Sequence, residues 1–276
     1  MDWIEYYRLA WAARGKVLDA LLAEETDLAR IFGRFDRFET ANRYQTDPET
    51  GQCGYVPRPG QHDPLTNLSM PEDGVSCGDQ ARFLPYVDLN VARMLADFAT
   101  GAEVVAEIGT GYGRQLFDLW LAGGGAPDTR FVGFEPNDNA RALAARLAAR
   151  LPAMNVTFLP GDFESFDPAP LATTGRVLLF TNFAVMFQER FPADFFERVA
   201  RLTSEVLMVF VEPVNQQIGH QDPGGGLAFN VDFVSRFNEA AAAGLIEPIY
   251  VGRDLFGRGD KIKRISILTA IKPAAG

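Results

Sequence analysis

The sequence predicts an α/β fold: a doubly wound, mostly parallel sheet of seven strands with an antiparallel edge strand. From residue 103 onward, short apolar runs alternate with segments of helical periodicity, as in a parallel sheet with helices on both faces. The last two apolar runs are joined by the Gly-rich turn FGRGD instead of a helix, which predicts an antiparallel pair. An N-terminal helical cap and lid precede the sheet.

The first 84 residues predict this cap and lid, and residues 85–276 predict the sheet-forming domain. Apolar side chains recur at helical spacing through residues 1–45, so this stretch is predicted to be helical. Residues 46–80 are rich in Pro, Gly, Asp and Asn and have no periodicity, which is typical of either a disordered segment or a functional lid. Scattered apolar residues in this loop favour an ordered lid.

The second domain is predicted to alternate between helices and strands. Helical periodicity is found at residues 85–100, Arg114–Leu121, Asn139–Leu151, Ala193–Leu202 and Val231–Ala243. Apolar runs predict strands at Val104–Ile108, Arg130–Glu135, Val156–Leu159, Arg176–Thr181, Val206–Val211, Ile249–Val251 and Ile262–Ile271.

The first of these strands leads into a loop with three glycines, in the sequence VVAEIGTGYGRQLF. Glu107 lies at the strand end, and Gly109, Gly111 and Gly113 precede a helix. Glycines suit a turn in which the backbone approaches a ligand closely, and the N–H groups at a helix start suit a polar ligand. The spacing differs from the G-x-G-x-x-G of nucleotide-binding Rossmann loops, because Arg114 stands where the third glycine would be.

The pattern E-x-G-x-G-x-G resembles motif I of the class I S-adenosylmethionine-dependent methyltransferases, whose fold is Rossmann-like. The resemblance covers residues 85–272 and continues at later strand ends in the order of that family. It implies that the glycine loop curls around the amino-acid end of the cofactor S-adenosylmethionine. It also implies that Glu107 lies near the amino group of the cofactor.

Two further motifs resemble the family's nucleoside-binding positions. The second strand ends in FVGFEPN, where Glu135 resembles the acid that binds both ribose hydroxyls and Asn137 follows as a further cofactor contact. The third strand leads into GDFESF, where Asp162 and Phe163 resemble the adenine contact. In the family, the acid accepts a hydrogen bond from the adenine amino group and the ring packs on the base.

The fourth strand ends in LLFTNF, which places Asn182 and Phe183 where the family lines the transfer site. The resemblance assigns Asn182 to the cofactor and to catalysis, and Phe183 to the acceptor. The run TNFA lacks both prolines of the Asn/Asp-Pro-Pro-aromatic motif of many methyltransferases that act on bases or protein amides. We therefore expect a small-molecule acceptor that is methylated on O, N or S.

Candidate bases and acceptor contacts lie in the lid and after the fourth and fifth strands. His220, after the fifth strand, and His62, in the lid, are candidate bases because histidine titrates near neutral pH. Glu212, Asn215 and Gln188 are candidate acceptor contacts, since ligands bind at this edge of an open α/β sheet. Solvated loop positions are the alternative for both histidines, and a thioether acceptor needs no base.

The charge and the hydrophobicity of the chain limit the kinds of substrate and partner that it is expected to bind. The formal net charge is −10 and the basic residues form no cluster, which argues against nucleic acid as the substrate and favours a small polar metabolite. No run approaches ~18 apolar residues and the N-terminus lacks a signal-peptide pattern, so we expect a cytoplasmic protein without a membrane partner. N-terminal helical caps often contribute to dimers, and a homodimer is therefore an open alternative to a monomer.

The cysteines and histidines predict no metal site, because their spacing suits no zinc ligand set. Cys53 and Cys77 suit reduced thiols, with a single disulfide between them as the alternative. Two other functions compete with methyl transfer. One is an NAD-dependent oxidoreductase, which the glycine spacing and the GDF motif disfavour. The other is a non-catalytic cofactor-binding protein on the same fold.

Overall fold

A computed structural model of the 276-residue chain describes residues 3–46, 53–57, 91–218, 230–252 and 266–274. Contacts divide the chain into two compact units, which are Met1–Val87 with Asn137–Pro152, and Asp88–Pro136 with Ala153–Gly276.

The described residues of the first unit form three helices and a two-stranded sheet. Its elements are α1 (Trp3–Glu24), α2 (Leu28–Ala41), α5 (Asp138–Ala148), β1 (Asn42–Thr46) and β2 (Cys53–Pro57). The carboxylate of Asp27 accepts the backbone N–H of Arg30 and thereby caps the start of α2. Arg146 of α5 forms an ion pair with Asp19 of α1 at 2.8 Å.

The predicted helix through residue 45 is wrong at its end, because the chain leaves α2 at Ala41 and forms the antiparallel pair of β1 and β2. Tyr44 and Tyr55, which are partners in this pair, also meet edge to face with ring centroids 6.0 Å apart. The predicted loop at 46–80 therefore includes a strand. Residues 58–80, including Cys77, lie outside the described residues, so the pairing of Cys53 with Cys77 stays a prediction.

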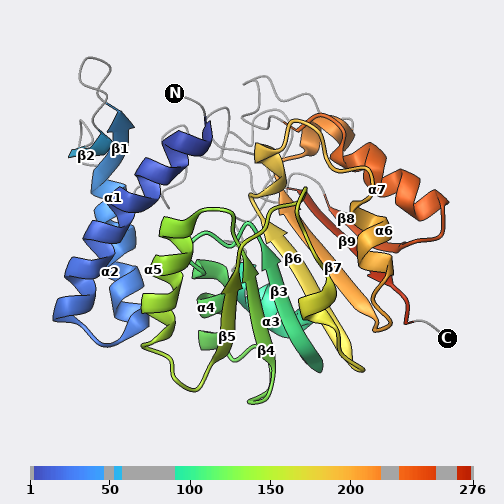
Figure 1. Cartoon of the computed structure of the whole chain (residues 1–276), viewed down its shortest axis with the longest axis horizontal. Coiled ribbons are helices and arrows are strands. Elements are labelled where there is room, and N and C mark those ends of the chain that lie inside the picture. Colours follow the sequence, from blue (N-terminus) through green and yellow to red (C-terminus); the bar gives the residue numbers. More distant parts are fainter. Residues whose placement is uncertain (1–2, 47–52, 58–90, 219–229, 253–265, 275–276) are drawn as a thin grey trace, which may run out of the picture. The chain divides into compact units, whose positions relative to one another are not determined.

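The second unit is built on a seven-stranded sheet of order β5-β4-β3-β6-β7-β9-β8 (Figure 1). Its strands are β3 (Ala102–Ile108), β4 (Arg130–Phe134), β5 (Asn155–Leu159), β6 (Arg176–Asn182), β7 (Val206–Glu212), β8 (Glu247–Gly252) and β9 (Ser266–Lys272). The first five strands in the order pair in parallel, and β9 runs antiparallel to both of its neighbours. The predicted fold class is confirmed, with the antiparallel strand one position inside the edge of the sheet.

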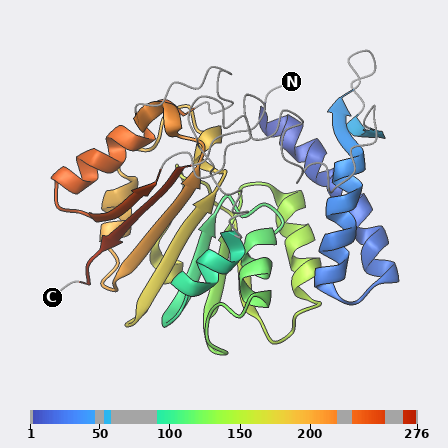
Figure 2. The same cartoon turned by 180° about the vertical axis from the view of Figure 1, so that it is seen from behind.

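Helices cover both faces of this sheet, which explains why its central strands are continuously apolar. All seven residues of β7 are buried. Figure 2 shows α3 (Val91–Phe98) and α4 (Arg114–Leu121) in front of the sheet, and Figure 1 shows α6 (Phe195–Ala200) in front of the opposite face. Phe196 of α6 packs against Phe237 of α7 (Phe233–Ala242), so α7 joins the core on the α6 side.

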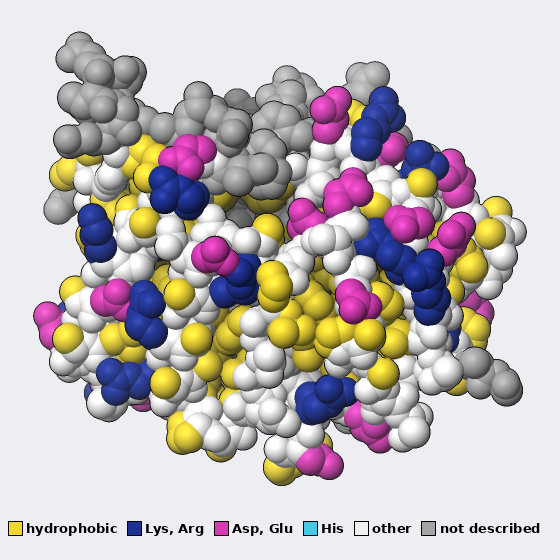
Figure 3. Space-filling model, viewed as in Figure 1, with side chains coloured by type: hydrophobic (Ala, Val, Ile, Leu, Met, Phe, Trp, Pro, Cys, Tyr) yellow, Lys and Arg dark blue, Asp and Glu magenta, His cyan; other side chains and the backbone are white. Residues whose placement is uncertain are grey.

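The surface and the helices give two further observations. On the face drawn in Figure 3, basic and acidic side chains lie interspersed. Among the helices that the structure describes, none combines the length and the apolar character that a membrane span requires.

The winding of the sheet reverses at β3. The chain passes from β3 to β4 and β5 on one side, and then returns to β6 and β7 on the other side. In open α/β sheets, ligands bind beyond the carboxyl ends of the strands at such a reversal. The residues that follow β3 and β6 are therefore where a site is expected.

Candidate functional site

The loop after β3 is shaped by glycines in the left-handed region. Gly109, Gly111 and Gly113 have φ values of 75°, 57° and 83°, where other residues are strained. The N–H groups of Gly109 and Thr110 both donate to the carbonyl of Phe134, at 2.9 Å and 3.0 Å. The loop is thereby tied to the end of β4.

Glu135 holds the same loop from the next strand. Its Oε2 accepts the N–H of Gly111 at 2.9 Å, and the residue is only 7% exposed. Its own backbone N–H donates to the carbonyl of Leu159 at the end of β5. Through its backbone and its side chain, Glu135 thus connects the ends of β3, β4 and β5. Asn137, predicted as a cofactor contact, caps α5 by accepting N–H groups of the first turn of that helix.

Glu107 is a buried carboxyl at the end of β3. Its pKa is raised to about 8, because burial disfavours the charged form more than the hydrogen bond from Thr110 favours it, and the negative charges of Glu135 and Asp118 add to the rise. The Thr110 hydroxyl donates to Glu107 Oε2 at 2.7 Å. Because acidic groups repel one another here, a cationic ligand would be favoured.

The turn after β5 contains the predicted adenine contact. Ser165 donates to Asp162 Oδ1 twice, from its N–H at 2.8 Å and from its hydroxyl at 2.6 Å. The resemblance implied that the ring of Phe163 packs on the adenine base, but the ring is not exposed to a ligand. The residue is 2% exposed, and its ring packs against those of Phe191 and Phe195, with centroids 5.2 Å and 5.8 Å away. The structure therefore places this ring in the core.

The turn after β6 is held by Glu212 at the end of β7. Glu212 Oε1 accepts the hydroxyl of Thr181 at 2.7 Å and the N–H of Ala184 at 2.9 Å. The pKa of Glu212 is raised to about 7, because the effect of burial exceeds that of the hydrogen bonds from Thr181 and from backbone N–H groups, which lower it. Glu212 is fully buried, so the structure shows it bracing the turn, where the sequence predicted an acceptor contact.

Asn182 and Phe183 occupy this braced turn. Phe183 has a φ of 56° and is the only non-glycine residue with positive φ in the described part of the chain. The strain of a left-handed bulky residue is found most often at functional sites. Asn182 Oδ1 is buried and has no hydrogen-bond partner within the described residues. A ligand with a donor group would satisfy this oxygen.

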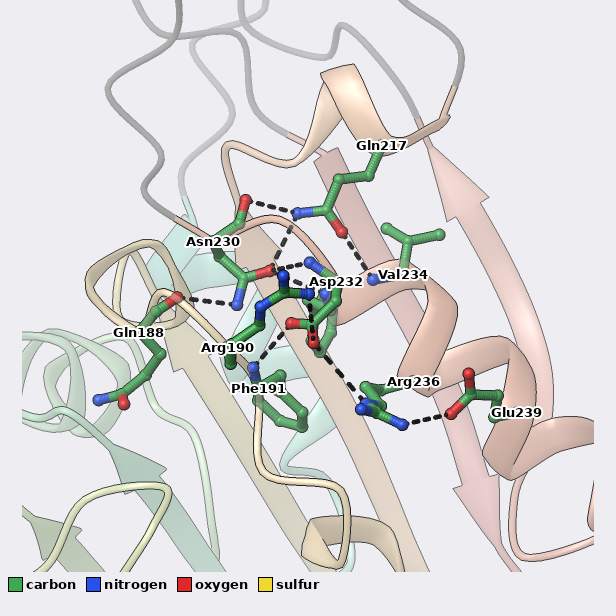
Figure 4. Close-up of polar contacts among 10 residues, drawn as sticks. Gln188, Arg190, Phe191, Gln217, Asn230, Asp232, Val234, Arg236 and Glu239 are labelled. Atoms are coloured by element: carbon green, nitrogen blue, oxygen red, sulfur yellow. Dashed lines mark hydrogen bonds and ion pairs between the residues drawn. The ribbon is translucent and has the colours of Figure 1, made fainter.

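Gln188 belongs to a polar network around Asn230 (Figure 4). The side-chain N–H of Asn230 donates to the carbonyl of Gln188, and its Oδ1 accepts from the amide of Gln217 and from the N–H groups of Asp232 and Phe233. The Gln188 side chain points away from these contacts. Gln188 therefore takes part in this network through its backbone carbonyl and not through its side chain.

The structure does not bring all predicted residues into one described site. Asn215 begins the short 3-10 helix η4 (Asn215–Ile218). His62 and His220, the two candidate bases, lie outside the described residues. Within the described residues, no group of three or more His, Cys, Asp and Glu side chains is arranged to hold a metal ion.

Sequence reasoning missed three contributors to this region: Thr110, Ala184 and Arg198. Thr110 donates a hydrogen bond to Glu107, and the backbone N–H of Ala184 donates one to Glu212. Both residues are neighbours of predicted positions, but the bond of Ala184 depends on the end of β7 lying beside the turn after β6. Arg198 had a signal, because it interrupts an apolar run in α6 between Phe195 and Val199. A charged residue on a buried helix face is rare unless it is paired.

Comparisons with known proteins give distant structural similarity. No protein-family model matches the sequence, and no curated protein matches it. Among solved structures, a SAM-dependent methyltransferase from Aquifex aeolicus has a TM-score of 0.47 at 17% identity, over 77% of this chain and 100% of that chain. The O-methyltransferase from Bacillus cereus in complex with SAH has a TM-score of 0.48 at 17% identity, over 66% and 79%. EvdMO1 has a TM-score of 0.42 at 19% identity. The match covers 67% of this chain but only 40% of the EvdMO1 chain.

Proposed function

We propose that the protein is an S-adenosylmethionine-dependent methyltransferase that transfers a methyl group to an O, N or S atom of a small polar metabolite. One observation carries the proposal: the Glu135 carboxylate at the end of β4 accepts the N–H of Gly111 in the glycine loop after β3. This bond places a carboxylate beside a backbone turn at the reversal of the sheet. A nucleoside with an amino-acid tail needs both features.

The residues present fit this cofactor. Its α-amino group and its sulfonium are positively charged, and they would face Glu107, a carboxyl whose pKa is raised to about 8 chiefly by burial and further by the negative charges of Glu135 and Asp118. Glu107 would bind the amino group, Glu135 would bind the ribose hydroxyls, and Asp162 would bind the adenine amino group. A bound cation would lower the pKa of Glu107 and offset the cost of its burial.

When bound, S-adenosylmethionine supplies a methyl group on a positively charged sulfur. The residues of the chain bind and orient the reactants and exclude water, since in-line displacement depends on alignment. The chemistry that the cofactor would supply is displacement at the methyl carbon by a lone pair of the acceptor atom, with the electron pair of the sulfur–carbon bond left on sulfur. A proton lost by the acceptor passes to a base or to water.

A polar acceptor is supported by two features. The formal net charge of −10 disfavours a polyanionic substrate. The buried Asn182 Oδ1, without a hydrogen-bond partner among the described residues, calls for a donor at the carboxyl end of β6. An acceptor that carries hydroxyl or amine groups offers such a donor.

Calorimetric titration of the whole chain tests the cofactor. We expect S-adenosylmethionine to bind with micromolar affinity and NAD not to bind. Glu135→Ala should abolish binding, whereas Glu197→Ala, which changes an exposed acid in α6, should keep it. Binding of NAD instead would favour the oxidoreductase. Cofactor binding without transfer of labelled methyl to any of a panel of polar metabolites would favour a non-catalytic cofactor-binding protein.

A further inference from the structure

Arg198 is a buried arginine in α6 whose guanidinium converges on one short turn. Its NH2 donates to the carbonyl of Phe163 at 2.7 Å. Its NH1 donates to the carbonyls of Glu164 and Phe166, at 3.0 Å and 2.8 Å. The residue is 8% exposed. One side chain therefore holds three of the four carbonyls of residues 163–166.

Burial of a guanidinium is costly unless its charge and its donors are satisfied, and Arg198 satisfies NH1 and NH2 but has no partner for Nε within the described residues. Asp194, one helical turn earlier, forms an ion pair with Arg198 at 3.1 Å and supplies the opposite charge. The planar guanidinium presents several donors in a fixed arrangement, whereas a lysine has one flexible ammonium. Arg198 is thus suited to fix the path of a loop that lacks a sheet partner.

The turn that Arg198 holds begins at Asp162. The hydroxyl of Ser165 and its backbone N–H both donate to Asp162 Oδ1, and the N–H of Asp162 donates to Ser165 Oγ at 3.0 Å. These bonds fix the Asp162 carboxylate relative to residues 163–166. Because Arg198 fixes those residues relative to α6, the orientation of the carboxylate depends on the guanidinium.

We propose that Arg198 is a positioning residue for recognition of the adenine base, which acts by holding the turn that presents the Asp162 carboxylate to the adenine amino group. This inference rests on the proposed function, because it needs a bound adenosyl group. It assigns base selectivity to a helix residue that touches only protein.

The test compares two ligands that differ at one position of the base. S-adenosylhomocysteine carries an amino group at C6, which donates to a carboxylate. S-inosylhomocysteine carries an oxygen there, which a carboxylate repels. For the wild-type chain we expect about ten- to a hundredfold tighter binding of the adenosyl ligand, as for a hydrogen bond to a charged group. Binding is measured by calorimetry on the full chain.

Arg198→Met should reduce this selectivity to less than about threefold, and Arg198→Lys should give an intermediate value, because lysine can reach fewer carbonyls. Arg201→Met, which changes an exposed arginine just after α6, should keep the wild-type selectivity. A purely structural role would lower the stability of Arg198→Met and Arg198→Lys but leave the ratio of the two affinities unchanged in the folded protein.

A double-mutant cycle with Asp162→Ala separates the outcomes. Asp162→Ala alone should lose the selectivity, and adding Arg198→Lys should change it no further. If Arg198→Lys keeps the full wild-type selectivity, the positioning role is wrong and the proposed function stands. If the wild-type chain binds neither ligand, the proposed function and this inference both fail.

Discussion

Gly109 and Ala184 are in contact at the reversal of the sheet, so closely that a Cβ built on Gly109 would stand 2.5 Å from the Cβ of Ala184. The first residue follows β3 and the second follows β6, so the two diverging loops touch there. The N–H of Ala184 donates to Glu212 of β7 at 2.9 Å. The position of the glycine loop is therefore coupled to two further strands.

We expect Gly109→Ala to destabilise the protein more than Gly123→Ala. Both glycines have left-handed φ values, 75° and 85°, but a Cβ at Gly123 meets no atom within 4 Å. Each change should cost about 1–2 kcal/mol for the backbone, and Gly109→Ala a further ~1–3 kcal/mol for overlap. Urea denaturation measures both. Adding Ala184→Gly to Gly109→Ala should recover part of the lost unfolding free energy, because it removes the Cβ that overlaps. Equal losses in Gly109→Ala and Gly123→Ala would contradict the contact.

Glu107→Gln should change how stability depends on pH. The folded-state pKa of Glu107 is raised from 4.5 to about 8, so folding binds its proton more tightly. The stability from this group is present below pH 4.5 and is lost as the pH rises through about 8, at up to about 1.4 kcal/mol per pH unit. The free energy of unfolding of the wild type should therefore fall relative to that of Glu107→Gln between pH 5 and pH 8.

The control for this titration is Glu197→Gln, which changes an exposed carboxyl of α6. It should keep the wild-type slope over the same pH range. Parallel stability curves for the wild type and Glu107→Gln would show that the Glu107 carboxyl is not shifted by burial.

Phe183→Gly should be more stable than Phe183→Ala, by about 1 kcal/mol, because both remove the ring but only glycine accepts a φ of 56° without strain. The opposite order is expected at Leu121, an exposed residue of α4, where alanine is the better helix former. Thermal and urea unfolding of the four variants would test the pair. The same order at both positions would argue against a left-handed Phe183.

Asn230→Ala should cost about 2–4 kcal/mol of unfolding free energy, because it leaves several buried polar groups unsatisfied. These groups include the N–H of Phe233 and the carbonyl of Gln188, with bonds of 2.8 Å and 2.9 Å to the Asn230 side chain. Asn238→Ala, at an exposed position of α7, should change stability by less than about 0.5 kcal/mol. Similar losses in the two variants would mean that the network contributes little.

Local pattern was enough to predict the central strands and α4. The apolar run Val206–Val211 became β7, and the predicted helix at Arg114–Leu121 has the bounds of α4. Both belong to the buried sheet unit, where the spacing of apolar residues along the sequence determines whether a segment forms a helix or a strand. The strand at Asn42–Thr46 was missed because its stability depends on pairing with Cys53–Pro57, and helical periodicity before it gave no sign of that pairing.

The candidate site was predictable where its residues follow one another along a strand end. The glycines and Glu135 could be located from the resemblance of the motifs at these strand ends to those of a known family. The burial of Phe163 could not, because it depends on the rings of Phe191 and Phe195, which arrive from a later segment. The same holds for Arg198, whose partners are carbonyls 32 to 35 residues earlier in the chain.

The place of β9 has a consequence for synthesis. Among the described strands, β8 pairs with β9 alone, although β8 is made first. When a nascent chain has emerged from the ribosome only as far as Gly252, β9 is still missing. β8 then lacks its pairing partner, and the edge of β7 that β9 will cover is still open. Until residues Ser266–Lys272 have also emerged, the uncovered edge of β7 and the unpaired β8 can both pair with neighbouring chains, which exposes the nascent protein to aggregation.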